Sequence, residues 1–290
     1  MNPTRQSHYP GYMVGVFLIP AVIIAVVLVA ALTSLFQYSF RETIPGSLKV
    51  GDFTLGNFGR MSAWIYLKVF LESLMLAGWT ALFNLLLGYP LALALVRSRS
   101  RTLKAAILIA TVIPMFSGDI VRTYSWLIVL GKNGFINGSL GSLGLIASPF
   151  EFLYTPLGVT LALVQYSMPV MVLILAAAIS HINPDYEKAA SSLGASPWRV
   201  FVHITLPLSR PGIISGSVTI FAWTLSAFAT PQLIGGGKVN MIANLVYQLG
   251  FSNFDFPFAA TLSMTALALT LLILAAMRLW LRRFETVETH

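Results

Sequence analysis

Long apolar runs separated by short polar segments dominate the sequence. A helix needs about 20 mostly apolar residues to cross the hydrocarbon core of a membrane. Runs that meet this test predict transmembrane helices over residues 12–36, 70–96, 105–130, 156–180, 212–233 and 257–281. The pattern therefore predicts an all-α integral membrane protein with six transmembrane helices, in which residues 1–290 form a single transmembrane domain.

Composition supports a membrane location and narrows the chemistry. The chain has 290 residues, of which 57% are hydrophobic and 10% charged, whereas a soluble domain usually carries about 25% charged residues. Its formal net charge is +8, and in a membrane protein such an excess indicates basic cytoplasmic loops rather than nucleic-acid binding. The absence of cysteine from the sequence excludes disulfides and thiolate metal sites.

The placement of lysine and arginine predicts the orientation. With six spans, both termini lie on the same side as the loops 97–104 and 181–210, and this side holds eleven basic residues against six on the other. Several of them follow a predicted span directly, as in "VRSRSRTLK". Because basic residues near span ends favour the cytoplasm, both termini and these loops are predicted to be cytoplasmic.

The sequence shows no pattern of an enzyme. The stretch "GGGKV" lacks the first glycine and the final hydroxyl residue of a phosphate-binding loop. The histidines are scattered, at His8, His181, His203 and His290. Neither H-E-x-x-H nor G-x-S-x-G occurs, and no pair of carboxylates shares a helix face within a span. We therefore predict no catalytic residue and no metal ligand.

Two ionisable residues interrupt the third predicted span. Asp119 and Arg122 are three residues apart and so share one helix face. They could neutralise each other in helix packing, or lie near the end of a broken helix after Pro114. Alternatively, Asp119 faces a water-filled path and attracts a cation, because ionisable residues inside a membrane commonly mark a pathway. The nearby Tyr124 and Trp126 are then candidates for the same path, or ordinary packing aromatics.

The polar segment 182–211 between the fourth and fifth spans predicts two short helices. Asn183 before proline and Ser196 before proline are typical of helix starts. A bend is expected at Gly194-Ala195, and the second helix is expected to end before Pro207. An amphipathic linker helix on the membrane surface is the simplest interpretation of this pattern.

Small and apolar residues divide the two helices into two faces. Ala189, Ala190 and Gly194 leave room for another surface to approach closely. The apolar residues predicted to hold the opposite face against the transmembrane helices are Phe201, Val202, Ile204 and Leu206.

The spacing of Ala189, Ala190 and Gly194, followed by "ITLP", resembles the EAA loop of permease subunits of type I ATP-binding-cassette (ABC) importers. The family has a glutamate directly before the two alanines, where this chain has Lys188, preceded by Glu187. Which of the two meets the ATPase stays open. The resemblance implies that ATPase coupling involves Glu187, Lys188, Ala189, Ala190, Gly194, Ala195, Ile204, Leu206 and Pro207.

The resemblance extends over residues 113–137, 155–175 and 228–248, and is strongest to the subfamily that imports spermidine and putrescine. Relatives in that subfamily import opines, phosphonates, amino-acid derivatives, iron or thiamine. It implies the type I ABC importer (MetI-like) permease fold and a non-catalytic subunit. A secondary transporter that needs no ATPase, or a membrane scaffold, is the alternative.

The resemblance also implies the partners and the location. A periplasmic solute-binding protein would deliver the solute, and a second, different permease subunit would complete a heterodimer in the lipid bilayer of the bacterial inner membrane. Two ATPase subunits would bind ATP and Mg, and this chain would bind no cofactor and no nucleic acid. Gly194→Val or Ala190→Asp is then expected to uncouple transport without preventing membrane insertion.

Overall fold

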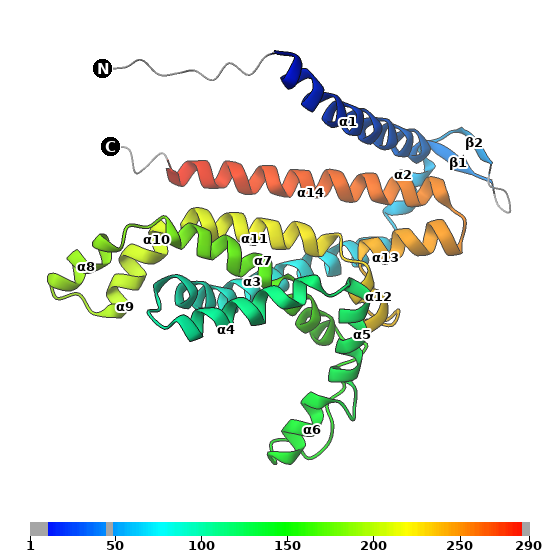
Figure 1. Ribbon diagram of the computed structural model, residues 1–290. Coiled ribbons are helices and arrows are strands. Elements are labelled where there is room, and N and C mark those ends of the chain that lie inside the picture. Colours follow the sequence, from blue (N-terminus) through cyan, green and yellow to red (C-terminus); the bar gives the residue numbers. More distant parts are fainter. Residues whose placement is uncertain (1–10, 45–48, 286–290) are drawn as a thin grey trace. The chain divides into compact units, whose positions relative to one another are not determined.

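A computed structural model describes residues 11–44 and 49–285, and the described part is almost wholly helical (Figure 1). The chain forms two compact units. The first contains the described residues up to Ser62 together with Val246–Ala268, and the second contains Ala63–Leu245 with the described residues from Leu269 onward. The prediction of an all-α membrane protein is confirmed, apart from one short hairpin.

The first unit is built from elements at both ends of the sequence. Its helices and strands are α1 (Gly11–Ser39), β1 (Arg41–Thr43), β2 (Val50–Phe53), α2 (Gly56–Met61), the π-helical turn η3 (Gln248–Ser252) and the beginning of α14 (Phe256–Glu285). The two strands pair antiparallel, with Arg41 opposite Phe53 and Thr43 opposite Val50.

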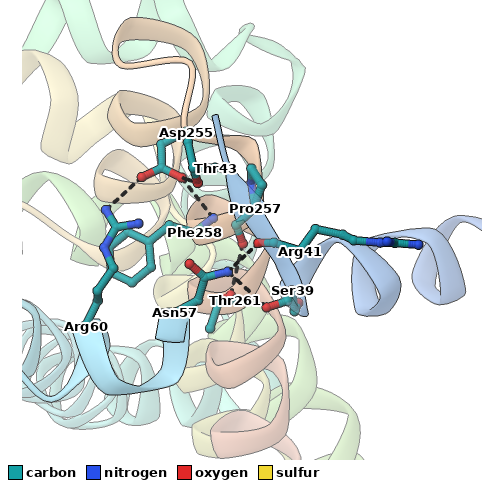
Figure 2. Close-up of polar contacts among 9 residues, drawn as sticks. All are labelled: Ser39, Arg41, Thr43, Asn57, Arg60, Asp255, Pro257, Phe258 and Thr261. Carbon is teal, nitrogen blue, oxygen red and sulfur yellow. Dashed lines mark hydrogen bonds and ion pairs between the residues drawn. The ribbon is translucent and has the colours of Figure 1, made fainter. Parts of the chain in front are cut away.

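Asp255 joins the separate elements of this unit (Figure 2). Its carboxylate accepts hydrogen bonds from the Thr43 hydroxyl and, at 2.7 Å, from Arg60. It also accepts one from the backbone N–H of Phe258 at 3.2 Å, which caps the start of α14. The Arg60 guanidinium lies 4.1 Å from the centroid of the Phe258 ring. The cluster therefore fixes the hairpin, α2 and α14 to one another, and the sequence pattern gave no sign of it.

The second unit centres on three helices that pack together, α3 (Trp64–Arg97), α7 (Pro156–Ser180) and α11 (Arg210–Leu225), seen side by side in Figure 1. Between α3 and α7, buried Asn84 donates a hydrogen bond to Ser167 at 2.8 Å, a polar contact typical of membrane helix interfaces. At Gly212 an added Cβ would collide with the side chain of Ala178. Glycine is thus required for the close approach of α11 to α7.

The third predicted span is broken. It consists of α4 (Arg101–Val112), the 3₁₀ turn η1 (Ile113–Phe116) and α5 (Asp119–Leu130), followed by the short helix α6 (Phe135–Ser142). The two halves are bent by 113° at the break. Proline in η1 and glycine before α5 interrupt the main-chain hydrogen bonds there, so the interpretation as a broken helix is confirmed.

The fifth predicted span is divided as well. Helix α11 stops at Leu225, and α12 (Ala229–Ile234) and α13 (Ile242–Tyr247) follow as short separate helices. Among the described residues, four helices are long and apolar enough to cross a membrane, or five if the bent pair counts as one span. The segment 212–233 is apolar enough, but its break makes each piece too short to pass that test alone.

The polar segment forms α8 (Pro184–Ser192), α9 (Pro197–Val200), the π-helical turn η2 (Phe201–Thr205) and α10 (Leu206–Leu208). Both helix starts are confirmed, because the Asn183 side chain accepts from a backbone N–H and the Ser196 side chain does the same. The expected end before Pro207 is wrong. In the wider π turn the Leu206 N–H donates to the Phe201 carbonyl, and this wider ladder accommodates the proline ring that would break a regular α-helix.

Candidate functional site

Arg122 holds the break in the third predicted span. Its guanidinium donates to the main-chain carbonyls of Pro114 and, at 3.1 Å, Ser117, both of which lie in the turn before α5. It also donates to the carbonyl of Tyr166 on α7 at 3.2 Å and lies 4.8 Å from the centroid of the Tyr166 ring. Arg122 thus links the broken segment to α7 through main-chain carbonyls of both.

Asp119 occupies the first turn of α5, on the side of a cavity. The ion pairs found within the described residues do not include one between Asp119 and Arg122. The hydrogen bonds of the neighbouring Arg122 go to main-chain carbonyls instead.

A cavity of about 770 Å³ lies between α5, α7, α11 and α12. Asp119 supplies its carboxylate, and three aromatic side chains that contribute to its wall are Tyr124, Tyr166 and Trp223. The rings of Tyr166 and Trp223 contact each other edge to face, with centroids 5.7 Å apart. The cavity thus combines one carboxylate, aromatic rings and apolar walls, which is a suitable environment for an organic cation.

The structure brings Asp119 and Tyr124 together but places Trp126 elsewhere. The Trp126 indole N–H donates to Gln165 at 3.0 Å, and its ring lines a separate pocket next to α4. Tyr166 and Trp223 of the cavity were missed, because an aromatic residue in an apolar span gives no sign of the face on which it lies. The sequence showed only that both residues lie near the middle of a predicted span, at a depth where a transport path would pass.

Glu187 faces inward from α8. Its Oε1 atom accepts a hydrogen bond from the Thr205 hydroxyl at 2.9 Å and lies 3.2 Å from Nη2 of Arg97, at the end of α3. The side chains of Arg97 and Glu187 are each 22% exposed. The same Arg97 nitrogen donates to the carbonyl of Ile182 at 3.0 Å. Glu187 therefore fastens α8 to α3 and to the π turn.

Lys188 faces outward on the same helix. Its ammonium group donates to Asp185 at 2.8 Å, and the two side chains are 74% and 72% exposed. The hydrogen bond from Lys188 and its positive charge lower the pKa of the Asp185 carboxyl from its usual range. The pair projects away from the helical bundle, so one residue step along α8 separates an inward acid from an outward base.

Three large apolar side chains are exposed on α8 and around the bend that follows it. Leu193 is 90% exposed, Trp198 71% and Tyr186 58%. Gly194, between the first two, has a φ of +85° and no neighbouring atom within 4 Å of a Cβ placed there. Such a concentration of exposed apolar side chains commonly marks a protein interface.

The other predicted coupling residues lie on both faces of the segment. Ala189 is exposed, and Ala190 and Ala195 are half-buried. Ile204, Leu206 and Pro207 are half-buried on the opposite side, where Leu206 packs against the apolar core of α3, α7 and α11. Of the small residues expected on an open face, Ala189 and Gly194 are exposed, whereas Ala190 is half-buried.

The glycines of "GGGKV" form a turn. Gly236 and Gly237 have φ values of +52° and +78°, which residues with a Cβ rarely adopt. The Lys238 ammonium group lies 5.8 Å from the centroid of the Tyr154 ring, and the Tyr154 N–H donates to the Ile234 carbonyl at 2.8 Å. These contacts give the segment a structural role in the loop.

Residues 84–286 match the family described as binding-protein-dependent transport system inner membrane component. The spermidine/putrescine transport system permease protein PotB of Escherichia coli (strain K12) is 34% identical over 214 residues, covering 73% of this chain and 77% of PotB. The inner membrane ABC transporter permease protein YdcU of the same organism is 30% identical over 92% of this chain and 90% of its own length.

A solved structure shares the fold. One chain of a bacterial alginate ABC transporter, in complex with an alginate-bound periplasmic protein, superimposes with a TM-score of 0.80 at 20% identity, covering 94% of this chain and 95% of that chain. The sequence matches establish more than the fold. This chain belongs to the family of binding-protein-dependent transport system inner membrane components, and it is a non-catalytic, multi-pass permease subunit of an ABC importer.

Proposed function

We propose that this permease conducts an organic polycation of the spermidine and putrescine class. The similarity to PotB supports this substrate class. The observation that carries the proposal is the cavity between α5, α7, α11 and α12, which places the Asp119 carboxylate beside Tyr124, Tyr166 and Trp223.

The cavity suits such a substrate for two physical reasons. An ammonium group interacts favourably with the carboxylate and with the face of an aromatic ring, and Trp is the strongest of these rings. The methylene chain of a polyamine can contact the apolar parts of the wall. Arg122 forms no ion pair with the acid, because the hydrogen bonds of its two terminal nitrogens go to main-chain carbonyls.

The proposal includes the partners and the orientation. A periplasmic solute-binding protein delivers the solute, a second permease subunit completes a heterodimer, and two ATPase subunits bind ATP and Mg. The ATPases dock at the segment 182–211, which places that segment and both termini in the cytoplasm. The terminal residues 1–10 and 286–290 lie outside the described part of the chain, so the support for the orientation comes from the basic loops.

The test is uptake of radiolabelled putrescine or spermidine by proteoliposomes that contain this chain, its encoded partners and its binding protein. Uptake is expected to require ATP, whereas uptake without nucleotide would support a secondary transporter. Asp119→Asn is expected to lower uptake about tenfold, since losing a close charge interaction worth about 1.4 kcal/mol has that effect.

A matched control separates the cavity from general charge effects. Glu151→Gln removes a carboxylate that is exposed in the loop before α7, and it is expected to leave uptake unchanged. Normal polyamine uptake by the Asp119→Asn variant would overturn the cavity assignment. Uptake of thiamine, a phosphonate or iron in preference to polyamines would overturn the substrate class while leaving the family unaffected.

A further inference from the structure

We infer that Lys188, rather than Glu187, is the charged residue of α8 that meets the ATPase, and that its partner there is a carboxylate. This inference rests on the proposed docking of ATPase subunits at the segment 182–211. It concerns the sign of the charge at that contact, because this chain has a base where its family is expected to have an acid.

The first step is that Glu187 is already engaged within the chain. Its Oε1 atom accepts from Thr205 and pairs with Arg97, whose side chain is equally shielded. Releasing Glu187 toward a partner would leave Arg97 without its carboxylate, and its Nε atom is already buried without a hydrogen-bond partner within the described residues. Uncompensated charge of this kind is costly, so the inward position of Glu187 is strongly favoured.

The second step is the composition of the outward surface. Lys188 is exposed on α8, and Leu193 and Trp198 are exposed at the bend that follows the helix. We call these three residues the docking surface. An exposed Leu193 and Trp198 require an apolar slot in the partner, and a lysine beside them requires an acceptor at the edge of that slot.

The third step is the charge around the docking surface. Lys188 and Arg199 are exposed there, and Asp185 is the exposed acid. With the charge of Glu187 turned inward, bases exceed acids on this side. Complementary potentials are usual across interfaces, so a partner with acidic groups beside the apolar slot fits, and a basic partner is disfavoured.

Carbodiimide cross-linking of the assembled transporter tests the inference directly. The reagent couples an amine to a carboxylate only when the two are in contact, with loss of one carboxylate oxygen to the reagent. We expect a cross-link between Lys188 and an Asp or Glu of the ATPase, located by mass spectrometry. Asp185→Asn removes the competing carboxylate on α8 and is expected to increase the yield.

Lys188→Arg is the matched control for the chemistry. It keeps the charge but offers no amine, so the cross-link is expected to disappear. Lys188→Glu places like charges together, and is expected to lower substrate-stimulated ATP hydrolysis about tenfold, as a penalty near 1.4 kcal/mol would. The exposed position of Lys188 makes misfolding an unsuitable explanation for such a loss.

Two outcomes separate this inference from the proposed function. If no ATPase co-purifies with the wild-type chain, the proposed docking fails. If the wild-type complex assembles and imports its solute, but Lys188 forms no cross-link to the ATPase and Lys188→Glu is fully active, the inference is wrong. A cross-link that is retained in Lys188→Arg would also overturn it, because another amine would then be responsible.

Discussion

Arg122 and Arg97 each stabilise a change of chain direction in the second unit, and they use different partners. Arg122 acts at the break before α5, and Arg97 acts at the turn between α7 and α8. Arg122 stabilises the 113° bend before α5 through main-chain carbonyls and the Tyr166 ring. Arg97 holds the polar segment through one carbonyl and the Glu187 carboxylate. Each leaves its Nε atom buried without a hydrogen-bond partner in the described part of the chain.

The difference teaches how firmly each bend is fixed. Carbonyl oxygens belong to the backbone, so the contacts of Arg122 persist as long as the bend itself exists. The attachment of α8 depends on a single side chain, which one substitution removes without unfolding the bundle. We therefore expect the bend at Arg122 to govern stability and the link at Arg97 to govern the position of the docking surface.

Arg122→Met should produce the largest effect. It removes charged hydrogen bonds to three carbonyls and a contact with an aromatic ring, which together contribute about 3 kcal/mol or more. We expect a large decrease in thermal stability of the purified protein in detergent and poor accumulation in the membrane. Arg122→Lys, which retains charge but cannot reach three acceptors, should recover part of the loss. Unchanged melting of Arg122→Met would show that the bend is held by packing.

Compared with Arg122→Met, Glu187→Gln should destabilise the protein less and should impair the coupling of transport to ATP hydrolysis more. The amide can still accept from Thr205, but Arg97 loses its counter-charge, at a cost of about 1.5–3 kcal/mol. We expect the protein to insert normally, while ATP hydrolysis responds less to the loaded binding protein.

The charge-swapped double variant Arg97→Glu with Glu187→Arg provides the control. It restores the ion pair, so it should recover coupling better than either single substitution. Asp185→Asn, on the exposed side of the same helix, should leave the response intact. If the double variant is no better than the single ones, Glu187 acts by another contact.

Thr205→Val should weaken the attachment of α8 to the bundle less than Glu187→Gln does. The hydroxyl donates one hydrogen bond to Glu187 at 2.9 Å and is almost fully buried, so its loss costs about 1–2 kcal/mol. Arg97 remains in place, and coupling should be reduced but not abolished. The expected rate of substrate-stimulated ATP hydrolysis lies between the rates of the wild type and of Glu187→Gln. A complete loss of stimulation would contradict this prediction.

Much of this contrast was accessible from the sequence, and part of it was not. Hydrophobic run lengths predicted the four long membrane helices, and residue types at helix starts predicted α8 and α9, because both depend on neighbours along the chain. A place for Arg122 near the end of a broken helix was one of the interpretations that the preceding proline and glycine allowed. The inward direction of Glu187 depends on Arg97 and Thr205, which local pattern cannot bring together.

The cavity shows the same limit. Asp119 stood out because a charge in an apolar run is rare, whereas Trp223 and Tyr166 looked like other aromatic residues of the spans. Trp126 is near Asp119 in sequence but contacts Gln165 on another side. Helix continuity was the third limit: the π turn before Pro207 is a departure from regular geometry that residue propensity does not encode.

Lys132 and Glu151 form a solvent-exposed ion pair, which can be compared with the more buried pair of Arg97 and Glu187. Their charged groups are 2.6 Å apart, but the side chains are 69% and 70% exposed. The hydrogen bond from Lys132 and its charge lower the pKa of the Glu151 carboxyl. The stabilisation from this ion pair is therefore present above the ordinary carboxyl pKa and is lost as the pH falls through the lowered pKa.

Solvent screens exposed ion pairs, so Lys132→Met should change the melting temperature at neutral pH less than any of the other variants. Under strongly acidic conditions it should not change the melting temperature. A decrease as large as that of Glu187→Gln would show that exposure does not separate the two pairs.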